Sequence, residues 1–182
     1  MRRTAAEAKQ VIRDAARERF ARDGYERTTI RGVAADADID PAMVMRYFGS
    51  KEGLFADAVD LDLRLPDLSL VPRGEVGAAL AGHFVDRWEA GDGLLMILLR
   101  TAATNAAAAE RMRSIFSDQL APAVARLLGD SPDAPVRAGL IASQILGLAL
   151  CRYTLAFPPI AEMSRQEVVA SVGPTLQRYL AA

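Results

Sequence analysis

Residues 28–55 of the chain are TTIRGVAADADIDPAMVMRYFGSKEGLF. Near the start of this stretch, apolar residues recur at the i, i+3, i+4, i+7 spacing of a helix with one buried side. These residues are Ile30, Val33, Ala34 and Ala37. Thr28 and Thr29 precede them with hydroxyls that can cap a helix, and Asp38 follows them with a side chain that tolerates the left-handed backbone of a tight turn. The pattern predicts a short helix that ends in a turn at Asp38.

A second short helix is predicted to begin at Pro41. Asp40 is a good N-cap, and Pro41 suits the first helical position because an N–H there would have no partner within the helix. Val44 and Phe48 share the face that is expected to pack. The opposite face carries Ala42, Met43, Arg46 and Tyr47. Two short helices joined by a turn, with one face presented, form a predicted helix-turn-helix motif at about residues 29–48.

Helices are also predicted on both sides of this motif. Gly49 suits the end of the second helix, and Ser50 can cap another that begins at Lys51. Upstream, an amphipathic helix that ends near Gly24 carries apolar residues at helical spacing. They are Ala8, Val11, Ile12, Ala15, Ala16 and Phe20. Residues 1–62 are therefore expected to form a DNA-binding domain of three to four helices.

The distribution of charge agrees with that division. The whole chain has a net charge of −1. Residues 1–51 hold 11 Lys and Arg against 8 Asp and Glu, whereas residues 52–182 hold 11 against 15. Basic groups are needed only where phosphate is approached. The basic residues of the first helix are either further phosphate contacts or an ordinary solvated face; they are Arg2, Arg3, Lys9, Arg13, Arg17, Arg19 and Arg22.

A group of N-terminal residues matches the pattern of a known family. The group comprises Gly24-Tyr25, Thr28-Thr29-Ile30-Arg31, Val33-Ala34, Ala37, Ile39, Tyr47-Phe48, Ser50-Lys51-Glu52 and Leu54-Phe55. Together these residues resemble the TetR family of bacterial transcriptional regulators. The resemblance implies an all-helical homodimer, most often a repressor, whose N-terminal domains enter successive major grooves of a near-palindromic DNA operator. It also implies that residues 63–182 form a regulatory and dimerisation domain, which binds a small-molecule effector that lowers DNA affinity.

The resemblance also implies which residues contact DNA. They are Thr29, Ala42, Met43, Arg46, Tyr47 and Lys51. Arg46 is able to make bidentate hydrogen bonds to guanine, whereas Thr29, Tyr47 and Lys51 are better suited to phosphate. Two positions depart from the family pattern, which often has Gly at Asp38 and, at Met45, an aromatic residue that contacts phosphate.

The rest of the chain is predicted to be helical, without strands. Pro66, Pro72 and Gly74 indicate a linker over about residues 65–74. Further helices are predicted over residues 76–90, 94–104, 107–121, 123–128, 136–157 and 164–180, with an interruption at Pro122 and a kink at Gly173-Pro174. The expected fold is therefore all-α, with about nine helices in all.

Several residues of this part are candidates for an effector cavity. Apolar and polar side chains of the kind that line ligand pockets are Phe84, Trp88, Met96, Arg100, Met112, Phe116 and Gln144. His83, Thr101 and Thr104 are further polar candidates. The alternative is that these residues are ordinary core or surface residues.

Two apolar stripes on the last long helices are candidates for a dimer interface. One consists of Ile141, Ile145, Leu148 and Arg152, and the other of Val168, Val172, Leu176 and Tyr179. The same stripes of two subunits are able to form a four-helix bundle. The alternative is that the stripes pack only within one subunit.

The composition disfavours an enzyme, a metal site, a cofactor and a membrane protein. The chain has one His and one Cys, and it lacks a Gly-rich phosphate loop and a His-Glu-x-x-His motif. The single Cys151 excludes an intramolecular disulfide, and the apolar stretch 138–157 is interrupted by Gln144 and Arg152. We therefore expect a cytoplasmic protein. The alternative function is a helical dimerisation or protein-interaction module without sequence-specific DNA binding, which the departure at Met45 and the weakly basic N-terminal domain favour.

Overall fold

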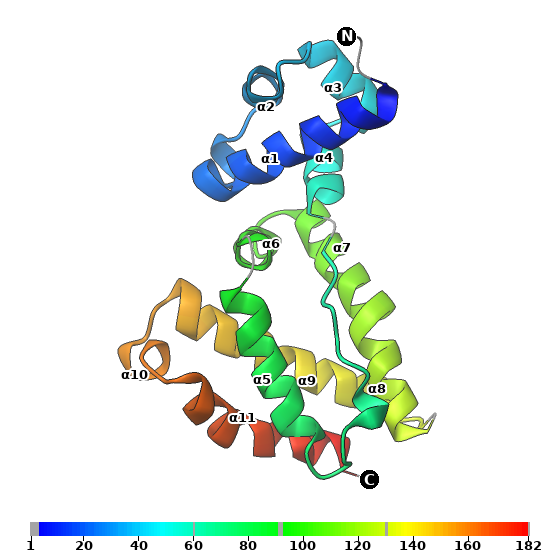
Figure 1. Cartoon of the computed structure of the whole chain (residues 1–182), viewed down its shortest axis with the longest axis vertical. Coiled ribbons are helices and arrows are strands. Elements are labelled where there is room, and N and C mark those ends of the chain that lie inside the picture. Colours follow the sequence, from blue (N-terminus) through cyan, green and yellow to red (C-terminus); the bar gives the residue numbers. More distant parts are fainter. Residues whose placement is uncertain (1–3, 60, 91–92, 130, 182) are drawn as a thin grey trace. The chain divides into compact units, whose positions relative to one another are not determined.

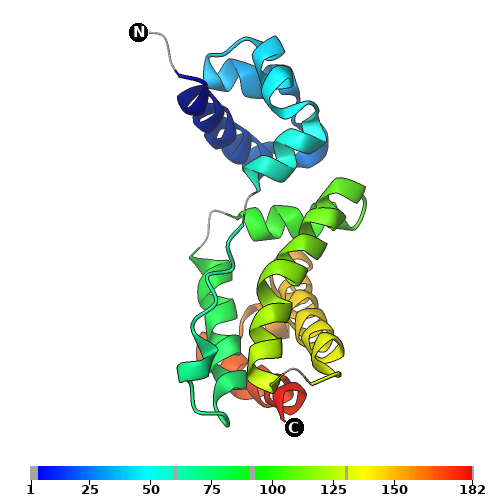
Figure 2. The ribbon, with the colours of Figure 1, turned by 90° about the vertical axis from the view of Figure 1, so that its right-hand side faces the viewer.

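The computed structural model describes residues 4–59, 61–90, 93–129 and 131–181. All regular secondary structure in these ranges is helical, which confirms the predicted all-α fold. The chain forms two compact units (Figures 1 and 2). Unit 1 consists of residues 1–61 and 92–112, and unit 2 of residues 62–91 and 113–182.

Unit 1 contains the four predicted N-terminal helices. These are α1 (Ala5–Arg27), α2 (Ile30–Ala37), α3 (Pro41–Phe48) and α4 (Lys51–Ala58). Gly24 interrupts the helical backbone of α1 at φ 76°, where the first helix was predicted to end. The unit also includes α6 (Leu94–Ala102), which packs against α1, and most of α7 (Ala106–Ile115). The first segment of this unit ends at residue 61, next to the boundary expected between residues 62 and 63, whereas the sequence analysis had assigned α6 to the C-terminal domain.

An aromatic cluster forms part of the core of unit 1. Phe20 and Phe55 meet edge to face with ring centroids 4.9 Å apart, and Tyr25 packs on Phe55 at 5.0 Å. Other buried side chains of the four N-terminal helices include Ile12, Ala16, Val33, Ala34, Ala37, Val44 and Leu54. The apolar face predicted for residues 30–37 is therefore confirmed from Val33 onward, while Phe48 is only half-buried.

The turns of the helix-turn-helix have the predicted chemistry. Asp38 adopts φ 52° and ψ 52°, and its N–H bonds to carbonyls at the end of α2. Asp40 caps α3 by accepting a hydrogen bond from the Ala42 N–H at 2.7 Å. Gly53 lies so close to the end of α3 that a Cβ atom on it would be 2.2 Å from the Phe48 carbonyl oxygen. The junction between α3 and α4 therefore requires glycine at this position.

Unit 2 is built from the remaining helices. They are η1 (Leu68–Leu70), α5 (Val76–Glu89), η2 (Phe116–Leu120), α8 (Ala121–Leu128), α9 (Ala134–Ala149), η3 (Leu150–Thr154), α10 (Pro158–Ala161) and α11 (Arg165–Leu180). The helix that begins as α7 continues through η2 and α8 without a break, and α9 continues into η3. With each continuous run counted once, the described residues form nine longer helices together with the two short segments η1 and α10, close to the number predicted.

Helices α5 and α11 lie side by side and form the largest helix contact of unit 2 (Figure 1). Their backbones approach closely, because a Cβ atom on Gly77 would be 2.4 Å from the Gly173 carbonyl oxygen. Gln177 strengthens the contact by accepting a hydrogen bond from the Gly77 N–H at 2.8 Å. The buried residues of this unit's core include Leu80, Val124, Ile141 and Leu176.

The predicted interruption at Pro122 is wrong. Proline has no N–H and its ring clashes with the carbonyl four residues earlier, so it usually breaks an α-helix. Here the five residues of η2 directly before α8 are π-helical, and the wider turn accommodates Pro122 near the start of α8. α11 also contains a proline, Pro174, at the position of the predicted kink, and it forms one continuous helix from Arg165 to Leu180.

Candidate nucleic-acid interface

Helix α3 presents one face and buries the other. Val44 is fully buried, which fixes the rotation of the helix against the core of unit 1. On the other side Ala42 and Arg46 are exposed, and Met43 and Tyr47 are half-buried. We call Ala42, Met43, Arg46 and Tyr47 the presented face of α3. The structure thus brings four of the six predicted DNA-contacting residues onto one surface.

Arg46 is the residue of this face with several hydrogen-bond donors. Its guanidinium makes no hydrogen bond or ion pair with any residue that the structure describes. Planar guanidinium groups match the two acceptors on the major-groove edge of guanine. The side chain is therefore available to a base.

Tyr47 lies beside a basic residue of α1. The Lys9 ammonium nitrogen is 5.6 Å from the centroid of the Tyr47 ring, and Phe48 packs edge to face against that ring with centroids 6.4 Å apart. The sequence left open whether Lys9 belongs to a solvated face or to the DNA site. In the structure it is next to the presented face of α3, a proximity that helical periodicity within α1 alone does not reveal.

Lys51 is held at the end of α1. Its ammonium group donates a hydrogen bond to the Glu26 carbonyl oxygen at 3.1 Å and lies 4.3 Å from the centroid of the Tyr25 ring. The Tyr25 hydroxyl in turn donates to Glu52 at 2.9 Å. Burial, together with the negative charge of Glu52, raises the pKa of Tyr25 to about 12. Tyr25 therefore fixes the first turn of α4, a role that the sequence analysis did not assign.

Thr29 caps α2 while its side chain remains exposed. Its Oγ1 accepts a hydrogen bond from the Gly32 N–H at 3.0 Å. The hydroxyl hydrogen is still able to donate to a phosphate oxygen. The neighbouring Thr28 is buried and donates to the Gly24 carbonyl at 2.8 Å, so it is a structural residue.

Four of the arginines of α1 are engaged inside unit 1. Arg13 pairs with Asp57, and Arg17 donates to the Ala58 carbonyl at 2.7 Å. Arg19 makes a bidentate pair with Asp36 at 2.6 and 2.9 Å, and this hydrogen-bonded pair lowers the pKa of Asp36. Arg22 pairs with Asp23. These four residues therefore join helices or stabilise α1, whereas Arg2 and Arg3 lie outside the described residues.

Met45 is exposed on α3, with 44% of its surface accessible. A thioether is a weak hydrogen-bond acceptor and has no donor. Met45 is therefore unable to donate to phosphate.

The predicted effector residues are divided between the two units. Phe84, Trp88, Phe116 and Gln144 are in unit 2, whereas Met96, Arg100 and Met112 are in unit 1. In unit 2, Trp88 stacks on Tyr153 at 5.8 Å and contacts Phe84 at 5.4 Å. In unit 1, Arg100, Thr101 and Thr104 line a groove of about 280 Å³ against the end of α1. His83 Nε2 is 2.9 Å from the Leu63 carbonyl oxygen, to which it donates.

Each of the two predicted dimer stripes includes residues that are buried in the core of their own subunit. Ile141, Val168 and Leu176 are fully buried within their own subunit. The other members are half-buried: Ile145, Leu148, Arg152, Val172 and Tyr179. Arg152 bonds to the Ile160 carbonyl at 2.8 Å and to Glu89 at 3.0 Å, and its buried Nε has no partner within the described chain.

A different face of α9, which continues into η3 at Leu150, is exposed and apolar. Val136, Leu140 and Leu150 have 66%, 41% and 39% of their surface accessible, and Ser143 and Gly147 between them are also exposed. Within Ala134–Thr154, an 18-residue stretch has a mean hydropathy of 1.5, and 22% of that stretch is buried in the subunit. The length and composition of this helix alone would allow it to cross a membrane, but one such helix is weak evidence for a membrane span.

The residues that the structure describes contain no cluster of His, Cys, Asp or Glu fit to hold a metal ion.

Two family models match the chain. The model for the Tetracyclin repressor-like, C-terminal domain matches residues 74–180. The model for bacterial regulatory proteins of the tetR family matches residues 12–58. Among curated proteins, comparison finds no significant match.

Solved structures share the fold over almost the whole chain. A TetR-family regulator from Streptomyces coelicolor A3 is 24% identical with a TM-score of 0.62, covering 99% of this chain and 98% of that one. A transcriptional regulator from Rhodococcus sp. Rha1 is 24% identical with a TM-score of 0.67, covering 94% and 95%. Salmonella enterica GusR is 18% identical with a TM-score of 0.69, covering 95% of each chain.

Proposed function

This chain belongs to the TetR family of bacterial regulatory proteins, and we propose that it is a homodimeric transcriptional repressor that a small-molecule effector releases from a near-palindromic operator. The observation that carries the proposal is the presented face of α3, where Arg46 is exposed while Val44 is fully buried. The site of action is the cytoplasm, where bacterial DNA lies.

The contacts divide into base contacts and phosphate contacts. Arg46 reads guanine in the major groove, and Ala42 and Met43 pack against thymine methyl groups or allow the helix to approach closely. Thr29, Tyr47 and Lys51 bind phosphate, which positions α3 without reading sequence. Because Lys9 lies next to the Tyr47 ring, it adds a further phosphate contact.

The exposed face of α9 supports the proposed dimer. Val136, Leu140 and Leu150 form an apolar strip, with the small residues Ser143 and Gly147 between them. Small residues allow two helices to approach closely, and a second copy of α9 related by a two-fold axis covers the same strip. The half-buried members of the predicted stripes, such as Ile145 and Leu148, flank this contact. Two subunits place two α3 helices in half-sites about 34 to 36 Å apart, or a multiple of one helical turn.

Release by an effector requires that the effector bind more tightly to the arrangement that does not fit the operator. A typical coupling lowers DNA affinity by about 5- to 150-fold. The family models support a ligand-binding role for the C-terminal domain in general, and no effector is named by them.

Binding to the DNA next to the protein's own gene tests this function. Fluorescence anisotropy is measured with that duplex and with a random duplex of equal length, each at several salt concentrations. The expected result is selective binding whose affinity falls steeply with salt. Equal binding to both duplexes contradicts a sequence-specific regulator and favours the helical dimerisation or interaction module.

A further inference from the structure

The chain passes between unit 1 and unit 2 at residues 61 and 62, 91 and 92, and 112 and 113. The last of these crossings lies inside the continuous helix of α7 and η2. The first lies in a segment without regular secondary structure, which begins shortly after α4. A helix fixes its own path through backbone hydrogen bonds, whereas an irregular segment needs other partners for its backbone groups. We call residues 62–65 the entry segment, because the chain enters unit 2 through them.

Three side chains of unit 2 hold the backbone of the entry segment. Gln119 of η2 accepts a hydrogen bond from the Leu63 N–H at 2.7 Å. His83 of α5 donates from Nε2 to the Leu63 carbonyl oxygen at 2.9 Å. Arg87, one turn further along α5, donates to the Asp62 carbonyl oxygen at 3.1 Å. Both backbone polar groups of Leu63 are therefore held, and the two partners come from different helices.

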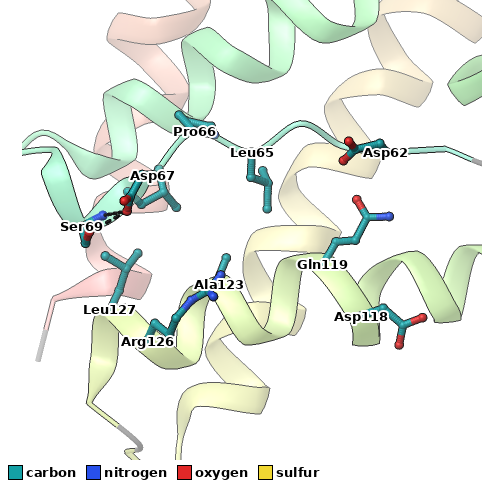
Figure 3. Close-up of a pocket in the computed structure, with 11 residues that line it drawn as sticks. Asp62, Leu65, Pro66, Asp67, Ser69, Asp118, Gln119, Ala123, Arg126 and Leu127 are labelled. Carbon is teal, nitrogen blue, oxygen red and sulfur yellow. Dashed lines mark hydrogen bonds between the residues drawn. The ribbon is translucent and has the colours of Figure 1, made fainter.

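Apolar packing supports the same segment. Leu63 and Leu65 lie two positions apart and pack against the core cluster of unit 2, in which Leu68 is buried. Figure 3 shows Leu65 pointing from the linker towards the helix of η2 and α8, and the Gln119 amide pointing back towards the linker. Hydrophobic packing is non-directional, whereas hydrogen bonds depend on distance and angle. The bonds to Leu63 are therefore what fixes the exact path of the segment.

The backbone of Arg64 indicates that this path is imposed by its surroundings. Arg64 has φ 50°, in a region that residues other than glycine rarely adopt. The Arg64 N–H donates to the Asp62 carboxylate at 2.8 Å, and the Arg64 side chain is exposed. An unfavourable backbone of this kind persists only where neighbouring contacts hold it. The contacts on either side of Arg64 are those of the entry segment.

We propose that Gln119 and His83 are positioning residues for operator binding. By holding Leu63 they fix the path of the chain from α4 into unit 2, and with it the separation at which the two α3 helices of a dimer meet the half-sites. The presented face of α3 lies in unit 1, so loss of these anchors leaves the face itself intact. The consequence for DNA, unlike the hold on the entry segment, rests on the proposed function.

Amide hydrogen exchange at Leu63, followed by NMR in the full-length protein, tests the anchor on η2. Gln119→Ala removes the acceptor and is expected to speed exchange of this amide by about fivefold, the value of one typical hydrogen bond. Gln166→Ala is the matched control, because it makes the same change at an exposed residue of α11. An exchange rate at Leu63 that is the same in Gln119→Ala and in the parent overturns the anchor.

Cleavage by trypsin after Arg64 tests the anchor on α5. A protease needs a locally released chain, so His83→Ala is expected to be cut faster at this bond than the parent. His83→Gln keeps a side-chain N–H donor and is expected to be cut at nearly the parent rate. Mass spectrometry of the fragments follows this one bond. Equal rates for His83→Ala and the parent, or for His83→Ala and His83→Gln, remove His83 as a donor that holds the segment.

Duplexes with altered half-site spacing test the positioning role. The selected operator, versions with one or two base pairs inserted between its half-sites, and a single half-site are titrated by fluorescence anisotropy. The parent is expected to prefer one spacing. In the double variant Gln119→Ala and His83→Ala, the affinity ratio between the spacings should fall towards one, while affinity for the single half-site stays at the parent value. Gln166→Ala should keep the parent ratio.

The outcomes separate this inference from the proposed function. A double variant that keeps the parent spacing preference, or that loses affinity for the single half-site to the same extent as for the operator, overturns the positioning role. A parent protein that selects no operator overturns the proposed function instead. The exchange and cleavage rates still decide in that case whether Gln119 and His83 hold the entry segment.

Discussion

The ammonium nitrogen of Lys51 lies 4.3 Å from the centroid of the Tyr25 ring. The same ammonium group donates to the Glu26 carbonyl at the end of α1, and the Tyr25 hydroxyl bonds to Glu52 in the first turn of α4. These contacts tie the first turn of α4 to the end of α1. They hold a positive charge near the start of α4, where the proposed function places a phosphate.

Lys51→Ala is expected to weaken binding to all duplexes alike, because a phosphate contact carries no sequence information. The dependence of log K on log salt should become shallower by about one unit. Anisotropy titrations at four or more salt concentrations measure this slope. Arg178→Ala, an exposed change on α11, is the control and should leave the slope unchanged. An unchanged slope for Lys51→Ala removes this residue from the DNA contacts.

Gly53→Ala should destabilise unit 1, although alanine usually favours a helix by about 1 kcal/mol relative to glycine. The added Cβ would be 2.2 Å from the Phe48 carbonyl oxygen, so the backbone between α3 and α4 must shift. Overpacking of this kind costs about 1 to 3 kcal/mol. Urea unfolding measures the change. Gly74→Ala is the matched control, because a Cβ there meets no atom within 4 Å. Equal stability of the two variants would show that the junction is not tight.

Stability should fall as the pH rises from about 10 towards 12. Burial raises the pKa of Tyr25 and of Tyr153 to about 12, whereas tyrosine in the unfolded chain ionises near 10.0. A raised pKa means that the folded state holds its proton more tightly, so this contribution is complete below pH 10 and is lost between the two values. Chemical unfolding across this range measures the loss. The double change Tyr25→Phe and Tyr153→Phe should flatten the decline, and an equally steep decline in that variant would contradict the assignment.

Leu140→Glu should dissociate the dimer. Leu140 lies on the exposed face of α9, and in the proposed dimer a carboxylate at that position would be desolvated by the two-fold related helix. Sedimentation velocity measures the oligomeric state, and operator affinity should fall with it. Leu70→Glu provides a control with the same chemical change at a residue that is 82% exposed on η1. A dimer that survives Leu140→Glu would place the interface elsewhere.

Local patterns in the sequence predicted the DNA-binding helices well. Asp38, Asp40 and Pro41 determine a turn and a cap through their own backbone preferences, so their roles follow from neighbouring residues alone. The same reasoning failed at Pro122, because the π-helical turn that accommodates it is a property of the preceding residues 116–120 and their packing.

Helical periodicity in the sequence does not predict contacts between distant residues. Tyr25 meets Lys51 and Glu52 across 26 or 27 positions of sequence, and the Leu63 N–H donates to Gln119 across 56 positions. Periodicity identified the stripes on the last two long helices, but it does not distinguish a face buried in the subunit from one covered by a partner. Ile141 and Leu140 are adjacent in sequence, and only the structure shows that the first is buried and the second exposed.

The base selectivity of Arg46→Ala tests the central claim most directly. Duplexes selected from a random library by the parent and by Arg46→Ala are sequenced, and affinities for single-base variants of the selected site are compared. If Arg46 reads guanine, the variant loses about 1 to 3 kcal/mol of binding free energy on the selected site and accepts other bases at one position of each half-site. Selection of the same sequence by both proteins, with unchanged discrimination at every position, would contradict the account.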